Sequence, residues 1–396
     1  MRSLVVNCGS SSLKCGLYAV ESGERLARGS IDRIGASDAT LTCEASGLRE
    51  SRALETKDHA AALEALCTSI FALSADAAGS EEILAVGHRV VHGGERFSEA
   101  TLIDGAVEAA IEELAPLAPV HNPLCLRGIR AARKLLPRAQ QIAVFDTAFH
   151  QTLPEAACLY AVPYDWYERD GVRRHGFHGT SHRWVAARTA ARWPDRASRL
   201  VVCHLGAGCS TTAILDGRSV DTSMGMTPLE GLVMGTRSGD VDPGVIAFIA
   251  KRRGLDIGEV EGILNHESGL LGVSGLSADI RELEGHAAAG HARAELALEI
   301  FAHRARKYIG AHHATLGGAT AVAFTGGAGE NSPSLRSRIM RGLDGLGMFL
   351  DTQANSSCKG GEAVISTPAS PVALLVVPTD EEQMIAREVH ALVSGT

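Results

Sequence analysis

The chain has 396 residues, which is too long for one ordinary hydrophobic core and sufficient for two domains. Its formal net charge of -8 argues against a protein that binds the phosphate backbone of nucleic acid. No apolar run reaches the ~18 residues that a membrane span needs, and the nine cysteines include no CxxC pair. We therefore expect a cytoplasmic protein with free thiols, whose partners are neither nucleic acid nor membrane.

Two segments about half a chain apart share one plan. LVVNCGSSSLKCGLYAV near the start and VVCHLGAGCSTTAILDG near the middle each contain a β-branched run, a turn of small residues and a second alternating run. Each segment is expected to form a β-hairpin. Because Gly9 and Gly206 occupy corresponding turns, the sequence suggests two similarly built halves, although two glycine-containing hairpins can also resemble each other by chance.

The remaining apolar runs alternate with helical patterns along the chain. Near-continuous apolar runs predict strands buried on both faces, and apolar residues at helical spacing predict helices between them. The predicted strands cover 85–91, 141–145, 321–324 and 372–377, and the predicted helices cover 60–73, 124–136, 184–192, 243–251, 294–316 and 381–392. This order indicates a layered α/β protein with a domain limit in a loop near residue 150.

Three glycine-containing segments are candidate phosphate sites. Segment 7–14 offers backbone N–H groups, three hydroxyls, an amide and a cation, which suit polyphosphate and a hydrated metal ion. It lacks the spacing of a P-loop. Segment 204–210 contains a GxG, and segment 325–332 is expected to be a loop that opens a helix at Ser332 or nearby, where bare glycines could admit a nucleotide. Tight turns without a ligand are the alternative for all three.

A fourth segment, 173–182, is rich in histidine and arginine. His178 and His182 are four residues apart, which permits a structural zinc site. However, Gly176 and Gly179 interrupt helical continuity, and no third acidic or thiolate ligand is nearby in the sequence. We therefore interpret the segment as an Arg/His cluster that stabilises a transferring phosphoryl group.

Two arginines and one aspartate outside these segments also suggest an anion site. Arg89 in GHRVVHGGERF and Arg237 in GTRSGDVDPG are flanked by glycines, so each guanidinium is expected to point into a cleft and bind carboxylate or phosphate. Asp146 ends the apolar run IAVFD, a position from which side chains commonly reach an active-site crevice. It could instead cap the following turn.

Together these segments resemble the acetate kinase family, within the acetate/propionate/butyrate kinase group. The resemblance covers residues 7–388, and its blocks are NCGSSSLK, GHRVVHGG, PVHNP, VFDTAFHQTLP, RRHGFHGTSH, HLGAGCS, SMGMTPLEGLVMGTRSGDVDP, SADIREL, GGAGENS and PTDEEQMIARE. It implies an α/β, two-domain, duplicated actin-like ATPase (ribonuclease H-like) fold of the actin/Hsp70/sugar-kinase superfamily, with an interdomain active-site cleft. The N-terminal domain would comprise residues 1–149 plus a C-terminal helix 382–396, and the nucleotide-binding domain residues 150–381.

The resemblance also implies an activity: reversible, Mg-dependent, in-line phosphoryl transfer from ATP to acetate, giving acetyl phosphate and ADP. The implied metal ligands for Mg²⁺ (or Mn²⁺) are Asn7 and Glu381, and a homodimer is implied.

The implied catalytic residues are Arg89, Arg237, His178, Asp146 and His121. Arg89 and Arg237 would grip the carboxylate and the phosphoryl group, and His178 would donate to the phosphoryl oxygens. The implied phosphate loop comprises Ser10, Ser12 and Lys14. The implied nucleotide contacts are His204, Leu205, Gly206, Ala207, Gly208, Asp279, Ile280, Arg281, Gly327, Ala328, Gly329, Glu330 and Asn331. The implied substrate pocket is formed by Arg89, Val91, Val120, Phe177 and Pro228.

Three positions depart from the family pattern. Ala207 stands where the family has Asn in HLGNG, His175 where Tyr is usual, and Val120 where Leu is common. The first removes an amide that could reach the nucleotide, and the third leaves more room for substrate, although one methylene discriminates by only ~1–3 kcal/mol. Acetate is therefore favoured, with a propionate or broad short-chain carboxylate kinase as the alternative. An ATP-driven switch of the actin or Hsp70 kind is the alternative from another class, but it has no need of Arg89 and Arg237.

Overall fold

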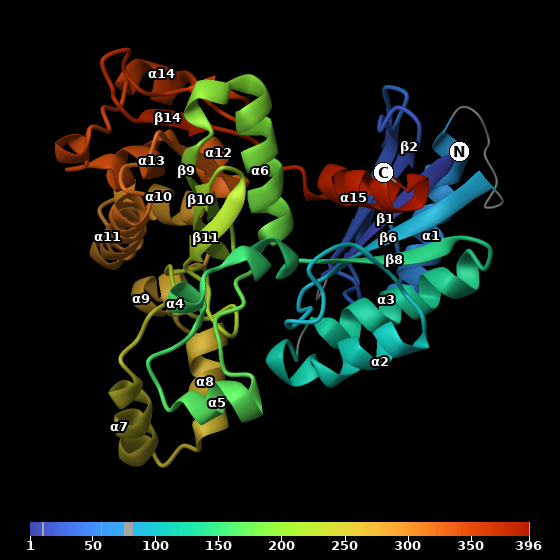
Figure 1. Cartoon of the computed structure of the whole chain (residues 1–396), viewed down its shortest axis with the longest axis horizontal. Coiled ribbons are helices and arrows are strands. Elements are labelled where there is room, and N and C mark those ends of the chain that lie inside the picture. Colours follow the sequence, from blue (N-terminus) through green and yellow to red (C-terminus); the bar gives the residue numbers. More distant parts are fainter. Residues whose placement is uncertain (10–11, 57, 75–81, 120, 396) are drawn as a thin grey trace. The chain divides into compact units, whose positions relative to one another are not determined.

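The computed structural model of the chain describes residues 1–9, 12–56, 58–74, 82–119 and 121–395. The chain forms two compact units, called here unit 1 (Met1–Phe149 with Asp380–Thr396) and unit 2 (His150–Thr379) (Figure 1). The first limit between the units lies where the sequence placed it, at residues 149 and 150. The second limit differs from the expected one, because Asp380 and Glu381 belong to unit 1 with the helix that they begin.

Unit 1 contains an eight-stranded sheet in the order β5-β4-β3-β2-β1-β6-β8-β7. Its strands are β1 (Arg2–Cys8), β2 (Ser12–Ala19), β3 (Arg25–Asp32), β4 (Thr40–Ala45), β5 (Leu48–Ala53), β6 (Ile83–Val90), β7 (Thr101–Leu102) and β8 (Gln140–Phe145). Its helices are α1 (His59–Leu73), α2 (Gly105–Glu113), α3 (Asn122–Leu135) and α15 (Glu381–Ser394).

The central strands of unit 1 alternate between two apolar layers, as period-two side chains require. Leu4 and Val6 of β1 pack with α1 and α3 on one face of the sheet, whereas Val5 packs with α15 on the other (Figure 1). Gly87 of β6 lies directly beneath α15, because a Cβ there would come within 2.6 Å of Val389 Cγ2. The C-terminal helix is therefore held closely on the sheet of the N-terminal residues.

Unit 2 contains a six-stranded sheet in the order β11-β10-β9-β12-β14-β13. Its strands are β9 (Arg199–Leu205), β10 (Cys209–Leu215), β11 (Arg218–Thr222), β12 (Ala321–Thr325), β13 (Ala363–Val364) and β14 (Ala373–Val376). Its helices are α4 (Glu155–Cys158), α5 (Tyr164–Asp170), α6 (Gly179–Arg192), α7 (Pro243–Arg253), α8 (Ile257–His266), α9 (Gly269–Ser274), α10 (Ile280–Ala288), α11 (Ala292–Thr315), α12 (Gly326–Asn331), α13 (Pro333–Met340) and α14 (Thr352–Ser357).

The two sheets share one topology. The order β3-β2-β1-β6-β8 in unit 1 corresponds to β11-β10-β9-β12-β14 in unit 2. In both sheets the first three strands are antiparallel neighbours, and the following pairings are parallel. The two predicted hairpins are the corresponding pairs β1–β2 and β9–β10, so the prediction of two similarly built halves is confirmed.

The predicted buried strands are present as β6, β8, β12 and β14, and the predicted helices as α1, α3, α6, α7, α11 and α15. The expected loop before Ser332 is wrong, since Gly326–Asn331 forms α12 directly after β12. Gly326, at φ +77°, turns the strand into the helix, and its N–H donates to Glu330 Oε1 at 2.9 Å. Ser332 then caps α13 as expected, accepting from the N–H of Leu335.

Across the described part of the chain, none of the helices combines the length and apolar character that crossing a membrane would demand.

Candidate active site

Three neighbouring strands of unit 1 bring together Asn7, Arg89 and Asp146. Strand β6 lies parallel to both β1 and β8, so the carboxyl ends of the three strands meet at one edge of the sheet. Arg89 Nε donates to Asp146 Oδ1 at 3.0 Å, and Nη2 donates to Oδ2 at 2.6 Å. Arg89 Nη1 donates to Asn7 Oδ1 at 3.3 Å. The sequence-predicted metal ligand, carboxylate-binding arginine and aspartate are thus one hydrogen-bonded group.

The carboxylates around Arg89 stabilise its positive charge. Burial acts to lower the pKa of the guanidinium, but the carboxylates of Asp146 and then Glu381 oppose it, and the net direction is upward. Asp146 is 1% exposed and the Arg89 side chain 20%. A forked, two-point ion pair of this kind fixes the guanidinium plane. Asp146 therefore fixes the orientation of the Arg89 guanidinium.

The other residues of unit 1 that were predicted for the site lie in the β1–β2 turn, on β2, directly after β6 and directly before α3. In the β1–β2 turn, Gly9 N donates to Ser12 O at 2.8 Å. Lys14 is exposed on β2, and its positive charge acts to lower the pKa of the Glu382 carboxyl, although burial raises that pKa overall. His121 precedes α3. Val91 is buried after β6. The predicted Ser10 and Val120 lie outside the described residues.

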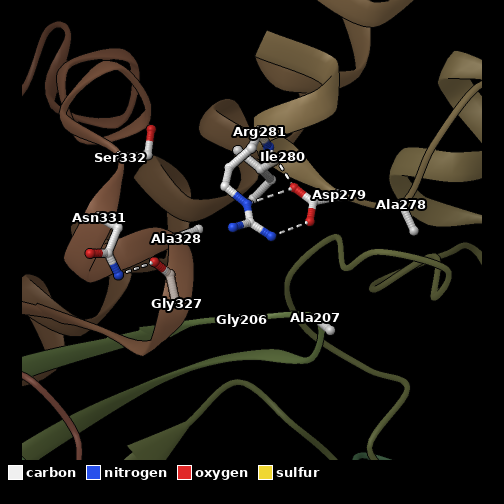
Figure 2. A pocket seen from close by; sticks show the side chains of 10 residues that line it. All are labelled: Gly206, Ala207, Ala278, Asp279, Ile280, Arg281, Gly327, Ala328, Asn331 and Ser332. Atoms are coloured by element: carbon white, nitrogen blue, oxygen red, sulfur yellow. Dashed lines mark hydrogen bonds and ion pairs between the residues drawn. The ribbon is translucent and has the colours of Figure 1, made fainter. Parts of the chain in front are cut away.

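Unit 2 contains a pocket of about 470 Å³. Figure 2 shows the three segments that line it: the β9–β10 turn, the start of α10, and α12 with the residue that follows it. Its lining residues are Gly206, Ala207, Ala278, Asp279, Ile280, Arg281, Gly327, Ala328, Asn331 and Ser332. Eight of the predicted nucleotide residues are among them. Ala278 and Ser332 lie in the matched blocks SADIREL and GGAGENS, but neither was given a nucleotide contact of its own.

Polar side chains at the pocket are held by local contacts. Asp279 caps α10 by accepting from Arg281 N at 2.7 Å, and the Arg281 guanidinium pairs with the same carboxylate at 2.9 Å. The hydrogen bond from Arg281 lowers the pKa of Asp279. Asn331 Nδ2 donates to Gly327 O at 3.0 Å within α12 (Figure 2). Ala207 lines the pocket at the position where the family pattern has an asparagine. The amide that is missing from this sequence would therefore have belonged to the pocket lining.

The other predicted nucleotide residues are not among the lining residues. Gly329 packs α12 against β9, since a Cβ there would lie 3.6 Å from Leu205 Cβ. Glu330 Oε1 accepts from Thr379 N at 3.0 Å as well as from Gly326 N. His204 and Gly208 belong to the histidine group described below.

We expect Gly326→Ala to destabilise the protein by ~1–3 kcal/mol and to raise the KM for ATP, because α12 could no longer begin directly after β12. The alanine would need a left-handed φ, and its Cβ would lie 2.9 Å from the backbone N and O of Leu205. Gly310→Ala in α11 is the matched control, since a Cβ there meets nothing within 4 Å and alanine favours the helix. Urea unfolding and ATP saturation curves measure the two effects. A normal KM for ATP in a destabilised Gly326→Ala protein would contradict a role of α12 in binding the nucleotide.

Arg237 differs from Arg89 in its surroundings. Its Nη1 donates to Pro228 O at 3.2 Å and lies 3.7 Å from Met234 Sδ. Within the described residues it forms no ion pair with a carboxylate, and burial lowers its pKa. A partly buried guanidinium in this state is suited to receive an anion.

His178 lies next to Arg237. A Cβ on Gly208 would be 3.5 Å from His178 Nε2 and 3.6 Å from Arg237 Nη1, so the two side chains flank the same glycine. His178 precedes α6 with a left-handed φ of +56°, and its ring stacks on His204 with 4.4 Å between centroids. The remaining predicted substrate-pocket residue, Phe177, is buried and accepts a hydrogen bond from His150 at 3.0 Å through its carbonyl.

His178 and His182, the pair considered for a zinc site, are connected through a serine hydroxyl. His178 Nδ1 and His182 Nε2 lie 2.9 and 2.7 Å from the same hydroxyl, that of Ser210. Over the described ranges, no cluster of three or more His, Cys, Asp or Glu side chains could hold a metal ion. The structure therefore assigns these two histidines to a hydrogen-bonded group with Ser210.

One residue that supports the pocket was missed by sequence reasoning. Arg336 of α13 is fully buried, and its Nη1 donates to the carbonyls of Gly329 at 2.8 Å and Glu330 at 3.0 Å. Its Nη2 donates to the carbonyls of Asn355 and Cys358. A cation at the carboxyl end of α12 satisfies carbonyls that the short helix leaves unpaired. Nothing in the RSR pattern of its helix distinguishes this arginine from an exposed one.

Known proteins resemble the chain over its full length. A family model described as the acetokinase family matches residues 2–387. Acetate kinase of Geobacillus kaustophilus (strain HTA426) is 48% identical over 391 residues, covering 98% of both chains. Acetate kinase 2 of Listeria monocytogenes serotype 4b (strain F2365) is 46% identical over 394 residues, covering 99% of this chain and 98% of the relative.

Solved structures agree with these sequence matches. The crystal structure of Porphyromonas gingivalis acetate kinase superposes with a TM-score of 0.89 at 43% identity, covering 99% of both chains. A propionate kinase from Francisella tularensis subsp. tularensis SCHU S4 superposes with a TM-score of 0.91 at 40% identity, covering 98% of both chains. The duplicated α/β fold is therefore the actin-like ATPase fold that the sequence implied. The chain belongs to the acetokinase family.

Proposed function

We propose that the protein is an acetate kinase, which transfers the terminal phosphoryl group of ATP to acetate, reversibly and with Mg²⁺, giving acetyl phosphate and ADP. The observation that carries the proposal is Arg237, a partly buried guanidinium without a carboxylate partner among the described residues, beside His178. Membership of the acetokinase family supports an ATP-using carboxylate kinase.

The nucleotide is assigned to unit 2. A pocket of about 470 Å³ lies in the size range of small-molecule sites, and its glycine-containing lining lets phosphates approach the backbone. His178 and Arg237 adjoin Gly208 in the same β9–β10 turn whose Gly206 and Ala207 line the pocket. We therefore assign adenosine to the pocket and the transferring phosphoryl group to Arg237 and His178.

The acceptor carboxylate is assigned to Arg89 of unit 1. Its guanidinium is fixed by Asp146 and its charge is permanent. An acetate carboxylate is ionised near pH 7 and is already a nucleophile, so no general base is required. The barrier lies in bringing two anions together in line, and positioned cationic donors lower that barrier most.

The side chains of unit 1 fit a magnesium ion. Asn7 Oδ1 and the carboxylate of Glu381 are hard oxygen donors, and both lie within the electrostatic reach of Arg89. Mg²⁺ usually binds one or two protein oxygens and takes its other ligands from water and substrate phosphates. We propose that Asn7 and Glu381 hold the ion, directly or through water; when bound, it would neutralise charge on the phosphates.

Propionate is the second candidate acceptor. The propionate kinase of known structure is 40% identical, and one methylene changes binding by only ~1–3 kcal/mol. We also propose that the protein is a cytoplasmic homodimer, as the resemblance implies. Sedimentation equilibrium would test the dimer directly.

The function is tested by trapping acyl phosphate with hydroxylamine after incubation with Mg-ATP and formate, acetate, propionate or butyrate. We expect the most hydroxamate with acetate, less with propionate, and none after chelation of divalent metal until Mg²⁺ or Mn²⁺ is restored. Propionate as the best acceptor would select the second candidate. ATP hydrolysis that is independent of any acid, with no hydroxamate, would reject both and favour a nucleotide-driven switch.

A further inference from the structure

The hydroxyl of Ser210 is shared by two imidazole rings. Ser210 is fully buried on β10, and its Oγ lies 2.9 Å from His178 Nδ1 and 2.7 Å from His182 Nε2. A serine hydroxyl carries one hydrogen. It can therefore donate to only one of the two rings. It could accept from both rings, but its own buried O–H would then have no acceptor among the described residues, so it donates to one ring and accepts from the other. The direction of this chain of hydrogen bonds decides which nitrogen of His178 is protonated.

His182 determines the direction of the hydrogen bonds through Ser210. Its side chain is fully buried, and burial together with the nearby His150, His204 and His312 lowers its pKa well below the usual range, so the ring is neutral. A neutral imidazole has one N–H. Among the residues that the structure describes, His182 Nδ1 has no hydrogen-bond partner. Since a buried, unpaired N–H is rarer and more costly than an unpaired acceptor, the hydrogen belongs on Nε2, where it donates to Ser210 Oγ.

We propose that His182 and Ser210 are positioning residues that hold His178 as the neutral Nε2–H tautomer, an inference that rests on the proposed kinase activity. His182 Nε2–H donates to Ser210 Oγ, and Ser210 Oγ–H donates to His178 Nδ1. The remaining hydrogen of His178 is then on Nε2, the atom that faces Gly208 beside Arg237 Nη1. There it donates to an oxygen of the transferring phosphoryl group, which supplements the charge of Arg237.

The opposite direction would impair the reaction. If Ser210 donated to His182, His178 would donate through Nδ1 and present a lone pair at Nε2 towards the anion. His182 would then bury an N–H at Nδ1 without a partner among the described residues. The stacking of His178 on His204 holds the ring plane in place, and His204 Nδ1 is itself bound to Ser181 Oγ at 2.8 Å. Stacking on His204 thus fixes the orientation of the His178 ring, and Ser210 selects its tautomer.

Ser210→Ala is expected to lower kcat by about 10–100-fold, since His178 would lose the bond that selects its tautomer, while the KM for ATP changes by less than about threefold. Ser210→Cys, with a weaker donor of similar shape, should fall between the variant and the parent. Thr212→Val is the matched control. Thr212 lies two residues further along β10, is equally buried, and its hydroxyl bonds to Thr222 Oγ1 at 3.0 Å instead of to a histidine. We expect it to lower the melting temperature similarly without changing kcat.

Nitrogen NMR of the full-length, histidine-labelled protein reads the tautomer independently of activity, with His178 assigned by its loss in His178→Gln. We expect an unprotonated Nδ1 and a protonated Nε2 in the parent, and a mixture of tautomers in Ser210→Ala. A protonated Nδ1 in the parent would overturn the inference. So would an unchanged kcat in Ser210→Ala when the parent forms acyl phosphate. Absence of acyl phosphate from the parent would instead reject the proposed function, while the resonances of His178 would still report the tautomer.

Discussion

Replacing Arg237 by alanine is expected to lower turnover at least ~10²-fold while leaving the free energy of unfolding unchanged or increased. The stability part follows from the surroundings of the guanidinium: burial lowers its pKa, and it has no ion pair with a carboxylate of the described residues. Its removal therefore relieves an uncompensated charge. The activity part follows because a preorganised cation beside His178 is lost from the place assigned to the phosphoryl group.

Arg237→Lys distinguishes geometry from charge. Lysine keeps the charge but lacks the planar fork, so turnover should remain at least ~10-fold below the parent. Arg188→Ala is the control in the same unit, because Arg188 forms an exposed ion pair with Glu362, which contributes only ~0–1 kcal/mol. Turnover of Arg237→Ala close to that of Arg188→Ala would remove Arg237 from the mechanism.

Arg89→Ala should lower turnover by a similar factor, at least ~10²-fold, but should also destabilise the protein by roughly 3–5 kcal/mol. The difference from Arg237 arises because Asp146, only 1% exposed, loses the guanidinium that compensates its charge. The double variant Arg89→Ala with Asp146→Ala removes both charges, and we expect it to recover part of the lost stability and none of the activity.

These two effects are separated by urea unfolding and steady-state kinetics on the same preparations. Recovery of activity in the double variant would show that Arg89 acts only by neutralising Asp146. Unchanged stability in Arg89→Ala would contradict the forked ion pair itself.

The fold was predictable from the sequence where the signal is local. The two hairpins follow from alternating runs around glycine turns, and β6, β8, β12 and β14 follow from apolar runs that are buried on both faces. Helix α12 was not predictable, because three glycines in GGAGEN give it poor intrinsic propensity. It forms through the cap from Glu330 and the buried guanidinium of Arg336, both of which depend on the folded chain.

The sequence indicated which residues belong to the candidate site, but not which of them contact one another. Arg89 and Arg237 both lie between glycines, yet one pairs with Asp146, 57 residues away in the sequence, and the other has no such partner in the described part of the chain. Likewise, the spacing of His178 and His182 suggested a shared metal, whereas they share Ser210, which is 32 and 28 residues away from them. Contacts of this range are set by sheet pairing, which the motifs do not contain.

The most direct test follows an oxygen atom. The protein is incubated with Mg-ATP and acetate labelled with ¹⁸O in both carboxylate positions, and phosphorus NMR is recorded on the products. If a carboxylate held by Arg89 attacks the terminal phosphorus, acetyl phosphate forms with one ¹⁸O in its bridging position, seen as an isotope shift of its phosphorus signal. Formation of ADP and unlabelled inorganic phosphate alone would show that water, and not the acid, is the acceptor.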